Sequence, residues 1–469
     1  MHKPILIIQM HRLGDIVLTF PLMGWLERLY PDTPVWVLAE EAFYKGLVSL
    51  SPRCVFFPHE GMPNLRQQPF STVINLSHTP EAAAFAGSLS CESLIGPYRT
   101  ADGTLHVKGD WQLYRTSLVH NNRYNLFHWA DMNALDLVPS SLFCRTMWPP
   151  PRVFTNTASA HIGLFLGASQ PDKHPDAEFW TELAGNLLLA GHRPVLLGGA
   201  SEKHLGRTVA EKLGAHALDM TGRFSIAELC RFIAELDLMI TPDTGPMHLA
   251  AWTGTPVLNL STGPVNAWET GPFSPGHHVV RAALPCVGCW QCTRKNVACK
   301  ERMHPRRTAF LVHELIRSGN NRLSRLNLPG QELLRTVRDQ YGLYALDQLA
   351  GKEQPRQLSA RLWQTFFGSQ FGILPEEALA PVWCDLVATS PNKASAFGVS
   401  LLALSRDLAA GLKSRTQSPV TQEDFWSRYP LPLRPLTSYI HMVLQNEVFA
   451  RSGFAKALAL VERLVMLVR

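Results

Sequence analysis

TPDTGPMHLAAWTGTPVLNL, residues 241–260, carries the clearest indication of the fold class. Asp243 or Thr244 can cap the helix that begins in this stretch. Gly245 permits a tight turn, and Pro246 suits a first helical turn because its missing N–H would have no partner there. Apolar strands precede and follow the helix, so the stretch is predicted to be a strand–helix–strand unit of a parallel sheet.

The same alternation of apolar runs and helical patterns extends in both directions from this stretch. Strands are predicted at residues 5–10, 35–38, 54–57, 73–76, 162–166, 194–198, 236–240 and 257–260, and helices at 16–29 and 178–190. A proline cluster at residues 149–151 divides the pattern. We therefore expect two Rossmann-like domains, residues 1–150 and 151–305, with a ligand cleft at the carboxyl ends of their strands.

The pattern changes after residue 305. Apolar residues recur at helical spacing over residues 331–349, 358–367, 394–412 and 449–468. No alternation of strands and no catalytic spacing is found there. Residues 306–469 are therefore predicted to be an α-helical extension.

Composition and charge limit the class of protein. Hydrophobic residues make up 46% of the 469 residues and charged residues 17%, which is typical of a globular chain. The net charge of +6 suits an anionic ligand or membrane headgroups, and it also favours solubility. No signal peptide and no uninterrupted apolar run of about 18 residues is found. We expect a cytoplasmic protein, at most peripheral to the inner membrane, with no nucleic-acid partner.

The helix start within residues 241–260 carries the strongest chemical signal. Free backbone N–H groups at a helix N-terminus attract a diphosphate. His248 lies in the opening turn and can face the same anion. The alternative is an ordinary strand–helix turn with a good cap, and spacing alone does not exclude it.

A second helix start lies in HRLGDIVLTFP, residues 11–21. Gly14 lets this loop approach a ligand closely. Asp15 can serve as a general base at the carboxyl edge of the sheet. The alternative is that Asp15 only caps the helix.

Two further strand-to-helix turns carry charged side chains. In GASQPDKHPDAEFW, residues 167–180, Lys173 can reach a phosphate or is simply solvated. In GGASEKH, residues 198–204, Glu202 can accept hydrogen bonds from a ribose, although glutamate is also common in a first helical turn.

Acceptor candidates follow the strand predicted at residues 73–76. Ser77 and His78 are expected to face the cleft, with a role in capping the next helix as the alternative. Arg123, Tyr124 and His128 form either a further acceptor surface or an ordinary polar face.

Four of the nine cysteines crowd into one short loop, as Cys286, Cys289, Cys292 and Cys299. Without a secretion signal these thiols are expected to be reduced, and four thiolates suit tetrahedral zinc or iron. We predict a structural metal site without an open coordination position. The alternative is a loop of four reduced cysteines.

Taken together, these segments resemble glycosyltransferase family 9, the ADP-heptose transferases of lipopolysaccharide core assembly. The resemblance spans residues 3–305 and is carried by DTGPMHLAAWTGTPV, RLGDIVLTFP and GASQPDKHPDAEFW. It implies the GT-B fold, with two Rossmann-like domains whose parallel sheets face a cleft, inversion at the anomeric centre, and no metal needed for transfer. The cysteine loop resembles the iron-binding cysteine finger of the autotransporter heptosyltransferases.

The resemblance also implies roles for individual residues. Asp15 is the counterpart of the catalytic base. The donor, ADP-heptose, is implied to contact Gly14, Ala168, Ser169, Lys173, Glu202, Asp243, Thr244, Gly245 and His248. The acceptor is implied to be a lipid-linked saccharide or a protein, and a second copy of the chain is a further expected partner.

Two classes of function stay open. The first is an inverting glycosyltransferase that moves heptose to a hydroxyl of the lipopolysaccharide core or of a protein; the cysteine loop and the helical extension favour the protein. The second is a non-catalytic nucleotide-sugar-binding or assembly subunit, against which Asp15 and Lys173 argue. A nicotinamide dehydrogenase is not indicated, because no G-x-G-x-x-G follows the first strand.

Overall fold

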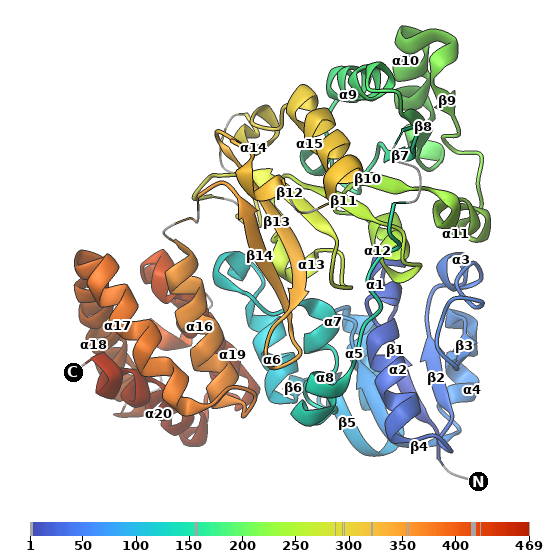
Figure 1. Cartoon of the computed structure of the whole chain (residues 1–469). Helices are drawn as coiled ribbons and strands as arrows, with labels where there is room; N and C mark the ends of the chain where they lie inside the picture. The colour runs from blue at the N-terminus through green and yellow to red at the C-terminus, as the bar shows by residue number, and fades with distance from the viewer. Residues whose placement is uncertain are drawn as a thin grey trace.

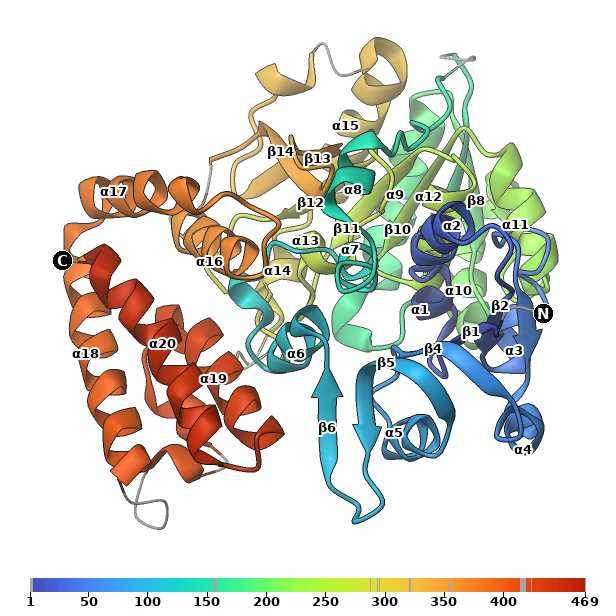
Figure 2. The same cartoon turned by 90° about the horizontal axis from the view of Figure 1, so that it is seen from below.

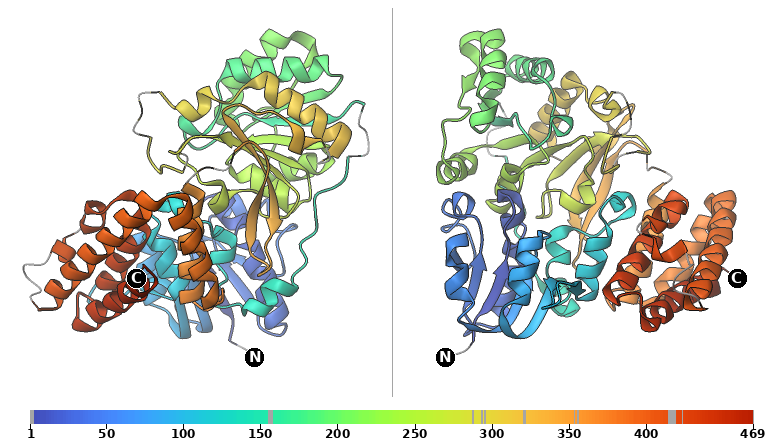
Figure 3. Two further views of the ribbon diagram at one scale, coloured as in Figure 1. Left: turned by 60° about the vertical axis from the view of Figure 1, so that its left-hand side comes forward. Right: turned by 180° about the vertical axis from the view of Figure 1, so that it is seen from behind.

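The chain folds into two α/β domains and a bundle of helices, as a computed structural model shows (Figure 1). The structure describes residues 3–154, 158–286, 288–292, 294, 296–319, 322–352, 354, 356–413, 419–422 and 424–468. Seen from behind in the right-hand view of Figure 3, the second domain lies above the first, and the bundle lies beside the first domain.

The first domain is a doubly wound sheet. Six described strands have the order β3-β2-β1-β4-β5-β6, and they run parallel except for β6, which pairs antiparallel with β5. The strands are β1 (Ile5–Ile8), β2 (Val35–Leu38), β3 (Val55–Phe57), β4 (Pro69–Asn75), β5 (Ser90–Arg99) and β6 (Leu105–Lys108). The helices are α1 (Leu13–Val17), α2 (Phe20–Leu29), α3 (Glu41–Tyr44), α4 (Met62–Leu65), α5 (Pro80–Gly87), α6 (Asp110–Ser117), α7 (Trp129–Met132) and α8 (Ser140–Arg145). Because apolar residues cluster on both faces, β1 reads as an unbroken apolar run.

The second domain repeats this plan and adds an antiparallel edge. Eight described strands have the order β14-β13-β12-β11-β10-β7-β8-β9, with β7 to β12 parallel. The strands are β7 (His161–Phe165), β8 (Arg193–Leu197), β9 (Leu218–Asp219), β10 (Leu238–Pro242), β11 (Val257–Ser261), β12 (His278–Ala282), β13 (Gln331–Arg338) and β14 (Tyr344–Ala350). The helices are α9 (Ala177–Leu189), α10 (Lys203–Leu213), α11 (Ile226–Glu235), α12 (Gly245–Trp252), α13 (Ala267–Thr270), α14 (Ala298–Glu301) and α15 (Pro305–Ser318).

Helical spacing predicts a helix over residues 331–349, and this prediction is wrong. The segment forms the hairpin β13–β14, which extends the second sheet antiparallel to β12. Asp339 accepts hydrogen bonds from the N–H groups of Tyr341 and Leu343, each at 2.9 Å, and Gly342 has a φ of 76°. These are the features of a tight turn. The free edge of β12 supplies main-chain partners, and this tertiary pairing outweighs the helical pattern.

The second domain therefore extends beyond residue 305. Helix α15 packs against the second sheet, with Leu311, Val312 and Leu315 buried in the same apolar cluster as Trp180 of α9. The hairpin β13–β14 follows, so the helical extension begins only at α16. The boundary predicted at residue 305 is corrected to about residue 350, where β14 ends.

The bundle at the C-terminal end is helical, as predicted. Its main helices are α16 (Arg356–Gln370), α17 (Leu379–Thr389), α18 (Pro391–Lys413), α19 (Arg434–Asn446) and α20 (Arg451–Val468). Among the described helices, α18 is long and apolar enough to cross a membrane when judged by length and composition alone. One face of it, with Phe397, Leu401, Leu404 and Leu408, is buried within the protein, whereas Val399 and Leu402 on α18 are exposed.

The bundle shares a hydrophobic core with the first domain. In Figure 2, α19 lies close to α6. The ring of Tyr114 lies 4.6 Å from that of Phe367, and the ring of Trp111 lies 5.0 Å from that of Phe371. All four belong to one apolar cluster, so the bundle is packed onto the first domain rather than tethered to it.

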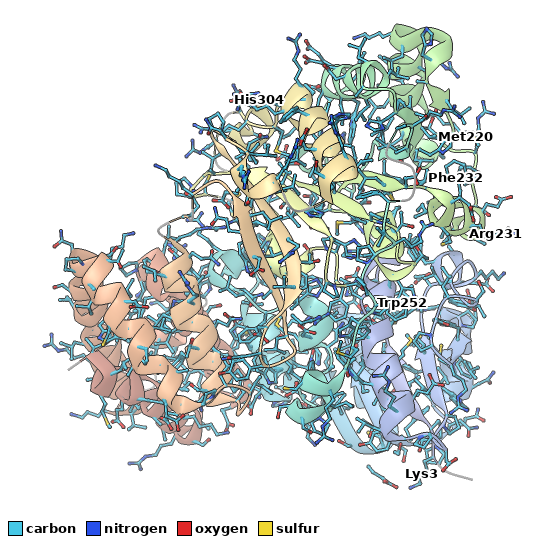
Figure 4. All side chains as sticks on the ribbon, viewed as in Figure 1. Lys3, Met220, Arg231, Phe232, Trp252 and His304 are labelled. Carbon is cyan, nitrogen blue, oxygen red and sulfur yellow. The ribbon has the colours of Figure 1, made fainter. Side chains whose placement is uncertain are left out.

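The two α/β domains also meet directly. Trp252 lies at their boundary in Figure 4, where its indole N–H donates to the carbonyl of Leu50 at 2.9 Å and its ring contacts Phe20. Arg338 at the end of β13 donates to Asp131 of α7 at 3.1 Å. Both partners of this ion pair are largely buried, so the hairpin β13–β14 anchors the second domain on the first.

Candidate active site

The starts of two helices, one from each domain, meet at the candidate site. A Cβ on Gly14 of α1 would lie 3.1 Å from Cδ2 of His248, and one on Gly245 of α12 would lie 3.2 Å from the backbone nitrogen of Gly14. A side chain at either glycine would crowd the other helix, so neighbouring groups would have to shift. The glycines of the two sequence motifs therefore serve one purpose, which is to bring the carboxyl ends of the two sheets together.

A cavity of about 730 Å³ opens beside this contact. That volume is in the range of pockets that hold a nucleotide-sized ligand. Of the residues predicted for the site, the cavity is lined by Gly14, Asp15, His78, Ser169, Lys173, Asp243, Thr244, Gly245 and His248. The structure thus brings together side chains that are more than 200 positions apart in the sequence, such as Asp15 and Asp243.

Asp15 stands in the first turn of α1. Its Oδ2 accepts a hydrogen bond from the backbone N–H of Arg12 at 3.2 Å, so the carboxylate also contributes to capping the helix. The side chain is half-buried and lines the cavity, which leaves carboxylate oxygen available to a ligand. Asp15 can therefore both cap the helix and present a carboxylate to the cleft.

The second domain supplies the groups suited to a diphosphate. Thr244 is the N-cap of α12, and its side chain makes no capping hydrogen bond to the first turn. The carboxylate of Asp243 is instead held by Thr270, whose hydroxyl donates to it at 2.6 Å. Lys173, on the loop after β7, lines the same cavity, and its carbonyl accepts a hydrogen bond from the hydroxyl of Thr262 at 2.8 Å. A helix N-terminus and a lysine facing one cavity can bind an anion.

His248 is almost fully buried in the first turns of α12. Burial lowers the pKa of its imidazole, although the charges of Asp243 and Asp15 oppose this shift. Its Nδ1 has no hydrogen-bond partner among the described residues. A neutral imidazole with an unsatisfied ring nitrogen is suited to hydrogen bonding with a ligand in the cavity.

Three predicted site residues do not line the cavity. Ser77 is buried, accepting from the N–H of Met10 at 2.7 Å, so the prediction that it faces the cleft is wrong. Glu202 accepts from the N–H of Gly199 at 2.7 Å and closes the turn that begins α10. Ala168 precedes the cavity residue Ser169. Contacts of Glu202 and Ala168 with the donor stay predictions.

The other three acceptor candidates lie in different surroundings. His128 is fully buried, and its Nε2 lies 2.9 Å from the carbonyl oxygen of Gly271, so it joins the two domains instead of facing an acceptor. Tyr124 is nearly buried as well. Arg123 is half-buried and lines a different cavity.

Several cavity residues escaped the sequence analysis. Arg115 of α6 is 4% exposed, yet it lines the cavity, and its Nε has no partner among the described residues. Its guanidinium lies 4.9 Å from the ring of Trp129, which lines the same cavity. His11 belongs to the HRLGD motif and could have been found from it, whereas Arg115 lies in a helix without any motif. Trp290 reaches the cavity from the cysteine loop.

The cysteine loop lies near the site without forming a compact ligand cluster. The N–H of Gly263 donates to Sγ of Cys299 at 3.2 Å, and Sγ of Cys292 donates to the carbonyl of Arg294 at 3.8 Å. Burial, followed by the charges of the neighbouring cysteines, raises the pKa of Cys289. Within the described part of the chain, no three His, Cys, Asp or Glu side chains are grouped so that they could hold a metal ion.

Two proteins whose sequences are similar to this chain are both named heptosyltransferases. Lipooligosaccharide heptosyltransferase 2 of Campylobacter jejuni is 26% identical over 166 residues, which cover 34% of this chain and 52% of that protein. Lipopolysaccharide heptosyltransferase 1 of Escherichia coli K12 is 23% identical over 309 residues, which cover 59% of this chain and 93% of that protein. The chain thus spans about half the length of the Campylobacter relative.

Solved structures and a family model complete the comparison. Escherichia coli ADP-heptose lps heptosyltransferase II has a TM-score of 0.49 at 19% identity, covering 67% of this chain and 98% of its own. The iron-containing dodecameric glycosyltransferase TibC from enterotoxigenic Escherichia coli has a TM-score of 0.42 at 16% identity, covering 68% and 77%. The model described as glycosyltransferase family 9 (heptosyltransferase) matches residues 64–298, half of the chain. The chain therefore belongs to glycosyltransferase family 9.

Proposed function

We propose that this protein moves a heptose from ADP-heptose to an acceptor hydroxyl, with inversion at the anomeric carbon. One observation carries the proposal: Asp15 of the first domain and Lys173, Thr244 and His248 of the second line the same cavity. A carboxylate from one domain and anion-binding groups from the other are what a transfer from a nucleotide diphosphate needs. The names of the relatives support heptose as the sugar.

The proposed reaction is a direct displacement. The acceptor oxygen forms a bond to the anomeric carbon of the donor as the bond from that carbon to the diphosphate oxygen breaks. The carboxylate of Asp15 takes the proton of the acceptor hydroxyl, which is a poor nucleophile while it keeps that proton. ADP leaves with the bonding electron pair. Attack opposite to the leaving group inverts the anomeric centre.

The second domain stabilises the leaving group. Negative charge on the diphosphate grows as the bond breaks, and we propose that Lys173 and the N-terminus of α12, which line the cavity, bind it. These groups are held before the reaction begins, so little reorganisation is needed during the step. His248, neutral because of its burial, donates or accepts a hydrogen bond without adding charge.

We place the reaction in the cytoplasm or at the inner face of the membrane, with a lipid-linked saccharide or a protein as acceptor. The net charge of +6 suits an anionic surface. The cysteine loop, whose Trp290 lines the cavity, supports an acceptor of more than a single sugar. Self-association of the chain belongs to the same proposal.

We also propose a structural iron or zinc ion held by Cys286, Cys289, Cys292 and Cys299. Four thiols in one loop are the donor set that these metals prefer. After burial, the neighbouring cysteines also raise the pKa of Cys289 and Cys299, so the four thiols lie near one another. Among the described residues, however, no three of them are grouped closely enough to hold a metal ion. The fit is therefore one of donor type rather than geometry, and no step of the transfer depends on the ion.

The deciding experiment incubates the purified full chain with ADP-heptose and one acceptor. The acceptor is a lipid-linked core saccharide in one reaction and a protein in another. We expect release of ADP and a heptose added to one acceptor, identified by mass spectrometry. Asp15→Asn is run in parallel and should bind ADP without transfer. Binding of ADP-heptose with neither transfer nor donor hydrolysis in the parent protein would instead favour a nucleotide-sugar-binding or assembly subunit.

A further inference from the structure

A second cavity, of about 370 Å³, lies where the first domain, the cysteine loop and the bundle meet. Its walls include Arg123 from the first domain, Arg294 from the cysteine loop and Arg434 from the start of α19. No Asp or Glu is among the described residues that line it. Three segments far apart in the sequence thus converge to place three arginines around one small space.

The arginines have no acidic partner in the described part of the chain. Arg123, Arg294 and Arg434 take part in no described ion pair. Arg434 is oriented by backbone carbonyls, donating to Ser427 at 3.1 Å and Tyr429 at 3.3 Å. These bonds fix its position, and no carboxylate among the described residues compensates its charge. Three of the four cysteines proposed to bind a metal, Cys286, Cys289 and Cys292, line the same cavity.

The two better-buried arginines repel each other. Partial burial and then the positive charge of Arg123 lower the pKa of Arg434. Arg356 adds to the crowding, because its Nη1 donates to the carbonyl of Arg123 at 3.4 Å. Like charges held together at a cost in free energy are relieved when an anion binds between them.

Trp290 connects this cavity to the candidate active site. Its side chain lines the cavity of Asp15, and its ring lies 5.5 Å from that of His120, which lines the arginine cavity. Both residues have left-handed backbones, with φ of 61° for Trp290 and 62° for His120. Such conformations are unfavourable for large side chains and persist where the surrounding structure holds them, often at functional sites.

We propose that the acceptor extends from the catalytic cavity across the indole of Trp290 and places an anionic group, a carboxylate or a phosphate, in the pocket of Arg123, Arg294 and Arg434. The proposal rests on the proposed function for the identity of the acceptor, but not for the existence of the anion site. An aromatic face suits a sugar ring or a flat peptide surface, and guanidinium groups suit either anion. The cysteine loop and the bundle thereby become parts of acceptor recognition.

The first test measures anion binding directly. The full chain is saturated with ADP, which fills the donor site, and is then titrated by calorimetry with inorganic phosphate or, in a separate arm, with succinate. Arg123→Gln and Arg434→Gln should each weaken binding about tenfold, the loss expected for one charge-assisted hydrogen bond. Arg451→Gln, an exposed arginine of the bundle, is the matched control and should bind like the parent.

The two arms separate the chemistries, because preference for phosphate or for succinate identifies the anion. Equal affinity in all four proteins, or no binding of either probe to the parent, would overturn the proposal. Loss of anion binding in the two variants combined with no use of ADP-heptose by the parent would preserve the anion site while rejecting the proposed transferase function.

The second test concerns Trp290. Trp290→Gly removes the indole while keeping the left-handed backbone accessible, and Trp290→Phe keeps an aromatic face. In transfer assays the glycine variant should raise the acceptor KM about tenfold, while the donor KM and the rate of donor hydrolysis stay within about twofold. The phenylalanine variant should recover most of the loss. Equal changes of donor and acceptor KM would mean that Trp290 serves the structure of the cavity alone.

Discussion

Glu269 of the second domain accepts a hydrogen bond from Asn122 of the first, with 2.6 Å between Oε2 and Nδ2. Its other carboxylate oxygen faces Nδ2 of Asn125 at 3.4 Å. Burial raises the pKa of Glu269 to about 7, because the amide hydrogen bonds and the charge of Arg115 only partly offset the loss of water. A carboxyl group that titrates near neutrality therefore sits in the interface between the domains.

This placement predicts that stability depends on pH. The folded chain keeps a proton on Glu269 up to about pH 7, whereas the unfolded chain releases it near the ordinary glutamate pKa of about 4.3. The contribution of Glu269 to the free energy of unfolding should therefore decrease as the pH rises from about 5 to about 7 and level off above. Buried histidines with a lowered pKa, such as His248, contribute in the opposite direction. In urea denaturation, Glu269→Gln should remove the contribution of Glu269 from the pH profile, and the exposed Glu462→Gln should leave the profile unchanged. Parallel pH profiles of parent and Glu269→Gln would contradict the assignment.

Loss of the carboxylate at Asp15 should stop transfer without removing the donor. Asp15→Asn should lower turnover by about 10²–10⁴, since the acceptor hydroxyl would lose its base. The amide oxygen can still accept from the N–H of Arg12, so the helix start should persist. Turnover is compared with that of Asp32→Asn, an exposed carboxylate outside the cavity. Rates within a few-fold of the parent would leave Asp15 as a helix cap alone.

The diphosphate site should respond to its individual groups. Lys173→Ala and His248→Ala should each weaken ADP binding by about 1.5–3 kcal/mol in calorimetry, the range for hydrogen bonds to charged groups. Lys212→Ala, an exposed lysine on α10, provides the control for a change in net charge. If ADP affinity were unchanged in both cavity variants, the donor would have to bind elsewhere.

The cysteine loop should carry one metal ion per chain. Elemental analysis of the purified protein is expected to find about one equivalent of iron or zinc, because four thiolates complete one tetrahedral site. Cys289→Ser should lose the metal and lower the unfolding temperature, whereas the exposed, isolated Cys384→Ser should change neither. A parent protein that contains no metal and is nevertheless stable and fully active would exclude the site.

Much of the fold follows from local pattern. The strand at residues 35–38 is observed at its predicted bounds, since a buried parallel strand needs an unbroken apolar run. The pairing of Gly14 with Gly245 could not be read from sequence, although each glycine was singled out, because only the packing of α1 on α12 brings them together. The hairpin β13–β14 was missed because the partner that decides it, the edge of β12, pairs with residues 49 to 57 positions away.

The candidate site likewise contains residues that the sequence could predict and residues that it could not. Asp15, Lys173 and His248 each lie at a strand-to-helix turn, where a sequence motif marks them. Arg115 and Trp290 reach the cavity from a helix and from a loop without such a motif, and their roles depend on tertiary packing. Ser77 was assigned to the cleft by its position after a strand, but its hydroxyl instead satisfies the N–H of Met10.

The last prediction concerns the bundle. A chain cut near residue 320 would lose β13 and β14 along with the bundle. A point substitution in the bundle therefore tests the role of the bundle without removing the hairpin. Phe367 is fully buried between Tyr114 of the first domain and Tyr439 of α19, with ring distances of 4.6 Å and 5.2 Å. Phe367→Ala should reduce the free energy of unfolding by about 3–5 kcal/mol, as expected when a large buried ring is removed.

The exposed Phe310 of α15 provides the matched control, and Phe310→Ala should change stability by less than about 0.5 kcal/mol. Affinity of folded Phe367→Ala for ADP should equal that of the parent, because the donor cavity contains no described residue of the bundle. Acceptor transfer or the mass found by light scattering should change if the bundle serves docking or assembly. Equal stability of the two variants would mean that the bundle does not pack on the first domain in solution. Loss of ADP binding by a folded Phe367→Ala protein would instead make the bundle part of the donor site.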